Sequence, residues 1–254
     1  MGDEARQQWT GPIEAVVLDA GGVLLLPDQE AIRAAVGPYV ADVPDDATCN
    51  RNHYRLMGEV DRIMEGVDTF DEPDWTGLDA TMATYFGVGD EHVDAVRPRL
   101  RDVYLATPWV AAPGAVGALL ALQAAGYPLA VVSNAGGDME EQLETRQICA
   151  VDGQSAQVAI VVDSHRVGVA KPDPRIFGYA LEALEIAAER CLYVGDTVHF
   201  DVKGARNAGL QPVHVDPHGF CGAVDHPHVG ALADLPPLLG PYPGATASGS
   251  SPRT

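Results

Sequence analysis

Asp19 has the clearest chemical setting in the sequence, because it stands directly before Ala20-Gly21-Gly22. Glycines in such a turn allow successive backbone amides to point at an incoming anion, and Asp19 adds a carboxylate beside them. Ser133 and Asp196 are two further polar residues that each follow a short apolar run. These groups could bind a small anion and a cation together, provided that the fold gathers them in one place.

Five short apolar runs have the length of strands that are buried on both faces of a sheet. They are residues 13–18, 129–132, 158–162, 191–194 and 213–215. Helical segments alternate with these runs, at residues 113–125, 175–184 and 201–208. Pro113 and Pro174 lie at the starts of the first two segments, and Gly126 and Gly209 follow the first and the third, as is typical of helix ends. The alternation predicts an α/β fold with a Rossmann-like parallel sheet and helices on both faces.

In such a sheet the ligand crevice lies beyond the carboxyl ends of the strands. Asp19, Ser133 and Asp196 all follow predicted strands at this end. We therefore expect these three side chains to converge, although they are far apart along the chain.

The chain divides into two predicted units and a tail. Residues 1–27 and 109–239 carry the strand rhythm and form the α/β core, whereas residues 28–108 lack it and look helical. We interpret residues 28–108 as an inserted helical cap. Residues 240–254 are rich in Gly, Pro, Ser and Ala and are predicted to be a disordered tail, because they offer too little apolar surface to offset the cost of ordering.

Composition excludes several classes of function. The 254 residues carry a net charge of −20, which opposes binding to nucleic acids or anionic membranes. No apolar stretch approaches the roughly 20 residues of a membrane span, and we expect a cytoplasmic protein. The four cysteines, Cys49, Cys149, Cys191 and Cys221, include no CxxC pair, so neither a zinc-ligand spacing nor a redox motif is visible.

Four segments in order resemble the motifs of the haloacid dehalogenase-like superfamily. They are residues 16–24 (VVLDAGGVL), 131–134 (VVSN), 169–177 (VAKPDPRIF) and 194–201 (VGDTVHFD), and the resemblance spans residues 13–215. Each fragment alone is a weak signal, since Gly-Asp before a helix is often a plain N-cap. All four in order, with a helical insertion after the first, identify the chain as a member of this superfamily.

The resemblance implies a phosphoryl-transfer site with a divalent metal. Asp19 would be the nucleophile, and Mg²⁺ would be held by Asp19, Asp196 and the backbone carbonyl of Gly21. Attack of a carboxylate on a phosphoryl group brings anion to anion, so a metal that prefers oxygen ligands is needed to neutralise charge. Asp201 would support the metal site or orient Lys171.

The remaining motif residues would bind the substrate, expected to be a small phosphorylated molecule. Ser133 would donate its hydroxyl to a phosphoryl oxygen, together with backbone amides of the Gly21-Gly22 turn. Lys171 would bring positive charge to the nucleophile and the transferring group. Asn134 is a further predicted substrate-binding residue.

One position departs from the family's phosphatases, in which the second residue after the nucleophile is an acid/base aspartate. Here it is Gly21, which supplies no proton. General acid–base help is typically worth about 10² to 10⁴ in rate. A cap residue or a bound water could take over the role, with His53, Arg55 and Asp28 as candidates. Alternatively, the substrate could have a leaving group that departs without protonation, such as an acyl or aryl phosphate.

Two other functions remain open at this point. Halide also leaves unprotonated, which fits a 2-haloacid dehalogenase, although the family's dehalogenases work without Mg²⁺. A catalytically inactive member could instead keep the fold as a binding protein.

Overall fold

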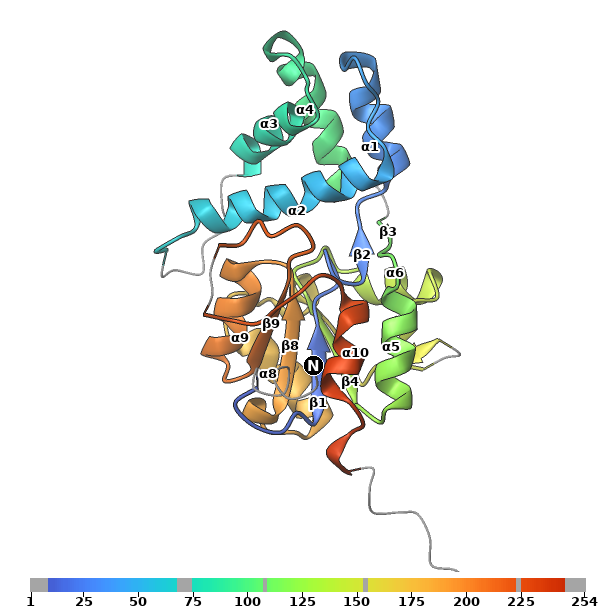
Figure 1. Cartoon of the computed structure of the whole chain (residues 1–254), viewed down its shortest axis with the longest axis vertical. Coiled ribbons are helices and arrows are strands. Elements are labelled where there is room, and N and C mark those ends of the chain that lie inside the picture. Colours follow the sequence, from blue (N-terminus) through green and yellow to red (C-terminus); the bar gives the residue numbers. More distant parts are fainter. Residues whose placement is uncertain (1–8, 68–74, 107–108, 153–154, 223–224, 245–254) are drawn as a thin grey trace, which may run out of the picture.

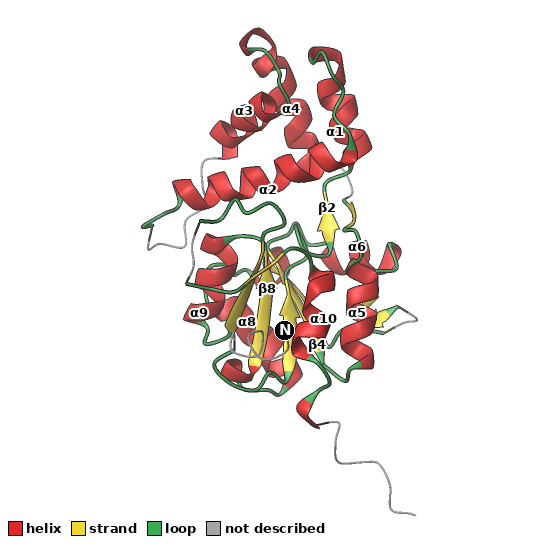
Figure 2. Cartoon of the chain, in the orientation of Figure 1, coloured by secondary structure: helices red, strands yellow, loops and turns green. Residues whose placement is uncertain are grey.

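A sheet of six parallel strands forms the centre of the computed structural model, which describes residues 9–67, 75–106, 109–152, 155–222 and 225–244. The strand order is β10-β9-β8-β1-β4-β7. Figures 1 and 2 show the sheet at the centre of the core, with helices around it. The strands are β1 (Ala15–Leu18), β4 (Leu129–Ser133), β7 (Val161–Asp163), β8 (Cys191–Gly195), β9 (Gln211–Val215) and β10 (His228–Val229). The α/β fold class predicted from the sequence is therefore confirmed.

The central strand β1 is buried on both sides, as its apolar run predicts. Val16 and Leu18 face one apolar cluster, which includes residues of α5 (Ala115–Ala124) and α10 (Leu235–Leu239). Ala15 and Val17 face the other, which includes residues of α8 (Arg175–Leu184). Helices on both faces thus fix β1, and with it the position of the loop that carries Asp19.

The helices around the sheet begin and end close to the predicted positions. Helix α8 matches its predicted range. The predicted helix 201–208 begins earlier, as a π-helix, η4 (Val198–Lys203), that continues into α9 (Gly204–Asn207). Single π-turns occur often at functional sites. The shorter helices α6 (Met139–Thr145) and α7 (Ser164–Val167) and the 3₁₀ turns η3 (Ala188–Arg190) and η5 (Leu232–Asp234) complete the core.

Four helices form a separate layer beyond the carboxyl end of the sheet (Figure 1). They are α1 (Gln29–Val36), α2 (Asp46–Ile63), α3 (Trp75–Tyr85) and α4 (Asp90–Leu105), with a 3₁₀ turn η2 (Gly37–Tyr39) after α1. They have an apolar cluster of their own, to which Phe200 of the core also contributes. Two antiparallel strands, β2 (Leu25–Leu26) and β3 (Val110–Ala111), pair where the chain leaves and re-enters the core.

Some short elements were not foreseen from the sequence. Strand β10 extends one edge of the sheet, and β5 (Cys149–Ala150) pairs with β6 (Ala156–Gln157) outside it. Strands of two residues carry too little periodicity to be recognised. Residues 245–254 of the predicted tail lie outside the described residues. Tyr242, which also belongs to the predicted tail, donates its backbone N–H to the carbonyl of Ala125 (3.0 Å) and packs its ring against Tyr127.

Within the described ranges, every helix is too short or too polar to cross a membrane.

Candidate functional site

The carboxyl ends of the central strands carry the predicted polar residues. Asp19 directly follows β1, Ser133 ends β4 and Asp196 directly follows β8. Because β1 lies between β4 and β8, the sheet brings these ends together. One carboxylate oxygen each of Asp19, Asp196 and Asp201 lies within 4.8 Å of the others, and all three residues are buried.

Two glycines allow this close approach. A Cβ on Gly22 would lie 1.9 Å from Asp196 Oδ2, and a Cβ on Gly195 would lie 2.3 Å from the Asp201 side chain. Gly22 also has a φ of +67°, which favours glycine. Glycine at both positions is therefore needed for Asp196 and Asp201 to reach the site.

Lys171 lies between two of the carboxylates. Its Nζ is 2.8 Å from Asp19 Oδ2 and 2.7 Å from Asp201 Oδ1, and it donates to Tyr193 Oη at 3.0 Å. Burial alone would lower the pKa of Lys171, but Asp19 and Asp201 outweigh it and raise the pKa. The ammonium is therefore charged and directed at the predicted nucleophile.

The carboxylate of Asp201 is occupied by protein donors. Oδ1 accepts from Lys171 and from the Tyr193 hydroxyl (2.9 Å), and Oδ2 accepts from the backbone N–H (3.0 Å) and the hydroxyl (2.7 Å) of Thr197. With four donors on two oxygens, this carboxylate is suited to hold Lys171 and the loop after Asp196. Of the two roles predicted for Asp201, the geometry favours orienting Lys171.

The amide of Asn134 is also engaged within the protein. Its Nδ2 donates to the carbonyl of Lys171 (3.0 Å) and its Oδ1 accepts the N–H of Lys171 (2.8 Å). This pairing fixes the backbone from which Lys171 extends, and the substrate-binding role of Asn134 stays a prediction. Ser133, its neighbour, lines the cavity of the site.

The residues present fit a divalent cation. Three carboxylates and one ammonium leave two excess negative charges in a buried space, and Asp196 Oδ2 has no hydrogen-bond partner among the described residues. Burial raises the pKa of Asp19 to about 7, although Lys171 opposes it, and burial together with Asp201 raises the pKa of Asp196 well above its ordinary value. A cation with oxygen ligands would hold both carboxylates ionised.

The space beside Gly21 is taken by Trp109. A Cβ on Gly21 would lie 3.3 Å from the Trp109 ring, which is tighter than ordinary contact. Trp109 stands between the helical layer and β3, donates its Nε1–H to the carbonyl of Tyr104 (3.2 Å), and packs edge-on against Tyr104 and His53. An apolar ring therefore lies where a family phosphatase would extend its acid/base carboxylate.

Of the three candidates for a replacement acid/base, one lies at the site. His53 is a buried residue of α2 and lines the cavity described in the next paragraph. Its Nε2 lies 3.4 Å from Asp196 Oδ2, and burial lowers its pKa to about 4. Asp28 caps the N-terminus of α1, and the Arg55 guanidinium stacks on Tyr85. Asp28 and Arg55 are thus used in packing the helical layer.

A cavity of about 630 Å³ lies between the sheet end and the helical layer. The charged residues described above form its base, and aromatic side chains from the helical layer form much of its wall. Arg146 of the core also lines it, held by hydrogen bonds to the carbonyls of Trp109 (2.5 Å) and Gln142 (2.9 Å). This volume suits a small metabolite.

Several residues of the site were missed by sequence reasoning. Tyr193, Thr197 and Trp109 have the contacts given above, and Asp61 of α2 accepts hydrogen bonds from the backbone N–H groups of Val198 (2.8 Å) and His199 (2.9 Å). Tyr193 could have been noticed as the one hydroxyl in an apolar strand. The other three carry no local signal, since their roles come from contacts across the fold.

Comparison with known proteins places the chain in a family. Residues 13–209 match the family model described as haloacid dehalogenase-like hydrolase, which is more than half of the chain. The chain therefore belongs to the haloacid dehalogenase-like hydrolases, as the four motifs predicted.

Individual relatives have different named activities. Phosphoserine phosphatase from Thermus thermophilus is 38% identical over 91 residues, covering 36% of this chain and 34% of that protein. Haloacid dehalogenase-like hydrolase domain-containing protein 3 from Bos taurus is 31% identical over 164 residues, covering 63% and 60%. The chain thus spans between about a third and three fifths of the length of these curated relatives.

Solved structures agree on the fold. The structure of a dehalogenase with an intermediate complex aligns with a TM-score of 0.59 and 22% identity, covering 91% of this chain and 98% of that one. At this identity the likeness shows the fold alone.

Proposed function

We propose that this protein is a Mg²⁺-dependent phosphatase that acts on a small phosphorylated metabolite through an aspartyl-phosphate at Asp19. The observation that carries the proposal is the contact of Lys171 with Asp19 beside Asp196 Oδ2, a buried oxygen that accepts no hydrogen bond from the described residues. The three carboxylates of this buried cluster outnumber the one ammonium beside them, and a bound cation would neutralise the excess negative charge. The relatives named as phosphatases support the same chemistry.

Each residue has a distinct role in this proposal. Asp19 attacks phosphorus and displaces the leaving group, after which water cleaves the acyl phosphate, releasing phosphate and restoring the carboxylate. Ser133 and the amides of the Gly21-Gly22 turn bind phosphoryl oxygens, and Lys171 stabilises their negative charge. Asn134 and Asp201 are positioning residues that hold Lys171.

Asp19, Asp196 and the carbonyl of Gly21 would hold Mg²⁺, which neutralises phosphoryl charge when bound. The helices of residues 28–108 would act as the cap over the crevice, with Tyr54 donating to the carbonyl of Gly22 (2.7 Å) as one point of contact. Arg146, the other cationic residue in the described lining of the cavity, would favour a substrate with a second anionic group.

Neither Gly21 nor Trp109 can protonate the leaving group, and burial lowers the pKa of His53 to about 4, which leaves its ring without a proton to donate as an imidazolium. The proposal therefore predicts a preference among substrates. Acyl and aryl phosphates should be hydrolysed faster than alkyl phosphates. The test is a phosphate-release assay with acetyl phosphate, p-nitrophenyl phosphate and glycerol phosphate, with Mg²⁺ and again with a chelator. Turnover should require Mg²⁺ and should vanish in Asp19→Asn, while Asp42→Asn, on the exposed surface, is the matched control.

A second candidate, a 2-haloacid dehalogenase, is favoured by the Trp109 ring packed on Gly21, because halide leaves without a proton and suits an apolar wall. Release of chloride from 2-chloropropionate in the presence of chelator would select it. Absence of turnover on both panels by a folded protein would reject both enzymes and leave the binding-protein alternative.

A further inference from the structure

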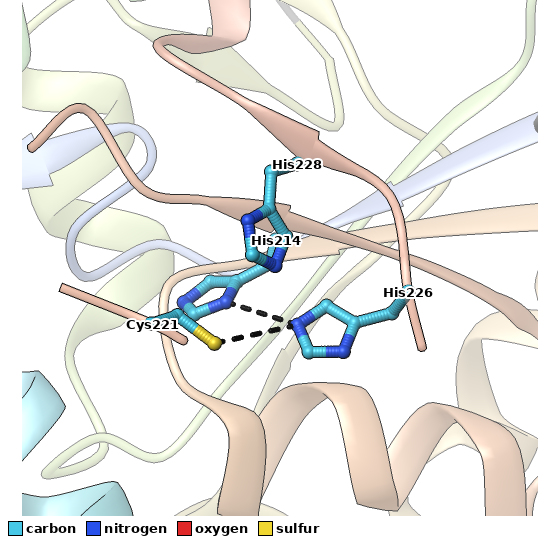
Figure 3. Close-up of side chains that lie close together, drawn as sticks. All are labelled: His214, Cys221, His226 and His228. Atoms are coloured by element: carbon cyan, nitrogen blue, oxygen red, sulfur yellow. Dashed lines mark hydrogen bonds between the residues drawn. The ribbon is translucent and has the colours of Figure 1, made fainter. Parts of the chain in front are cut away.

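A second cluster of metal-ligating side chains lies at the β9–β10 edge of the sheet (Figure 3). His214 comes from β9, His228 from β10, and Cys221 and His226 from the connection between these strands. One ligand atom from each of the four lies within 4.8 Å of the others. His214 and His226 are buried, and Cys221 and His228 are partly exposed, so that an ion could enter from solvent.

The hydrogen bonds of two histidines fix which ring nitrogens carry protons. His214 Nε2 lies 3.0 Å from the carbonyl oxygen of Asp196, which only accepts, so Nε2 is the protonated nitrogen. His226 Nδ1 lies 2.7 Å from Asp225 Oδ1, and Asp225 Oδ2 accepts from the Arg206 guanidinium (2.7 Å). This carboxylate accepts as well, so Nδ1 is the protonated nitrogen of His226.

The two remaining nitrogens, His214 Nδ1 and His226 Nε2, therefore face each other at 3.2 Å with lone pairs on both (Figure 3). Two lone pairs at this distance repel unless a cation lies between them. In addition, His228 Nε2 is buried without a hydrogen-bond partner among the described residues.

The spacing of these atoms matches a tetrahedral metal centre. With Zn–N near 2.05 Å and Zn–S near 2.3 Å, two nitrogens of a zinc site are about 3.3 Å apart, and a nitrogen and a sulfur about 3.6 Å. The observed separations are 3.2 Å for His214 Nδ1 and His226 Nε2, and 3.8 Å for Cys221 Sγ and His226 Nε2. The carboxylate of Asp225 behind His226 is the outer partner that metal-bound histidines commonly have.

We infer that His214, Cys221, His226 and His228 form a structural zinc site, separate from the carboxylate site at Asp19. Three imidazoles and a thiolate are soft ligands that suit Zn²⁺ and not Mg²⁺. Four protein ligands fill a tetrahedral shell and leave no position for substrate, which is typical of a structural site. Zn²⁺ binding would displace the thiol proton of Cys221, because the thiolate is the form that binds the metal.

The ion would add a further link between β9, β10 and the connection between them. Strand β10 has only two residues and lies at the sheet edge, and a metal would anchor it to β9. Phe220, next to Cys221, packs against Arg51 of α2, and His214 contacts the backbone of Asp196. The zinc site would thus hold the loop beneath the helical layer, next to the loop that carries Asp196.

Cobalt substitution tests this inference independently of any enzyme activity. Co²⁺ added to the metal-stripped full-length protein should give a thiolate-to-cobalt charge-transfer band in the near ultraviolet and the visible bands of a tetrahedral centre, at one equivalent. Excess Zn²⁺ should remove both sets of bands. Zn²⁺ at about 100 times its dissociation constant should also raise the Tm by roughly 5 to 10 °C.

Variants assign the signal to the four residues. Cys221→Ser should abolish the charge-transfer band, and His226→Ala should remove tetrahedral binding. His218→Ala is the matched control from the same connection, and Asp19→Asn is the control for the carboxylate site; both should keep the band. The inference would be overturned if the wild-type protein gave no thiolate-to-cobalt band, or if the band persisted in Cys221→Ser. The result for the wild-type protein remains decisive even if a variant does not fold.

Discussion

The two sides of the cavity differ in how their residues are held and in what they can do. On the core side, charged groups follow strand ends and are tied to one another and to the backbone, as Lys171 is by Asp19, Asp201 and Asn134. The side formed by the helical layer is mainly aromatic, and Asp61 and Tyr54 provide hydrogen bonds from it to the core.

This difference teaches which side controls which property. Charged groups that must stabilise a transition state need fixed positions, and strand ends of a packed parallel sheet provide them. A layer that contacts the core through fewer polar groups can differ in shape without disturbing the reacting groups. We therefore expect core substitutions to change turnover and helical-layer substitutions to change selectivity or closure.

Apart from the loss of the nucleophile in Asp19→Asn, the largest effect is expected on the core side, from Lys171→Met. Loss of the ammonium leaves Asp19 and the transferring phosphoryl group without their positive partner, and kcat should fall by about 10² to 10³. Lys203→Met is the matched control, because Lys203 is the other lysine of the chain and donates to the carbonyl of Val67. Steady-state kinetics with p-nitrophenyl phosphate would measure both. Equal losses in the two variants would contradict a specific role for Lys171.

An intermediate effect is expected where the two sides meet, at Gly21 and Trp109. Gly21→Asp alone should change the rate only a few-fold, because the new side chain meets the Trp109 ring. Gly21→Asp combined with Trp109→Leu should raise kcat on glycerol phosphate by about 10-fold or more, since the carboxylate then has room to protonate the leaving group.

The ratio of rates on glycerol phosphate and p-nitrophenyl phosphate would measure this gain, with Trp109→Leu alone as the control. A full gain from Gly21→Asp by itself would show that Trp109 does not block the position.

The smallest effect concerns Asp61, which links α2 to the core. Burial raises its pKa from 3.8 to about 7, opposed by hydrogen bonds from Val198 and His199. Between pH 3.8 and about 7, Asp61 is protonated in the folded protein and ionised in the unfolded protein. The folded protein therefore binds one proton more, and the free energy of unfolding that this proton contributes is lost as the pH rises toward 7. An asparagine at position 61 has no proton to gain or lose in this pH range.

The Tm of Asp61→Asn relative to wild type should therefore be higher at about pH 8 than at about pH 5, by a few degrees. Thermal unfolding of both proteins at the two pH values measures the difference, with Asp42→Asn as an exposed control. Parallel dependence of the three Tm values on pH would mean that Asp61 remains ionised at no cost in the folded protein.

The sequence by itself determined the sheet and the ends of its central strands. Apolar runs of strand length, alternating with capped helices, leave few other folds, and the rule for parallel sheets then places Asp19, Ser133 and Asp196 at one edge. These inferences depend on local patterns that a single chain displays. Residues 13–18 therefore predicted both β1 and the location of the loop after it.

Only the tertiary structure decided which partner each of these side chains has. The ring of Trp109 beside Gly21, the engagement of Asn134 and Asp201 with Lys171, and the meeting of Cys221 with three histidines all depend on contacts between distant residues. A search for cysteine pairs missed this last cluster, although four of the eight histidines lie at residues 214–228. Ligand spacing along the chain carries little information when the ligands come from two strands and the loop between them, because the sheet and not the sequence sets their separation.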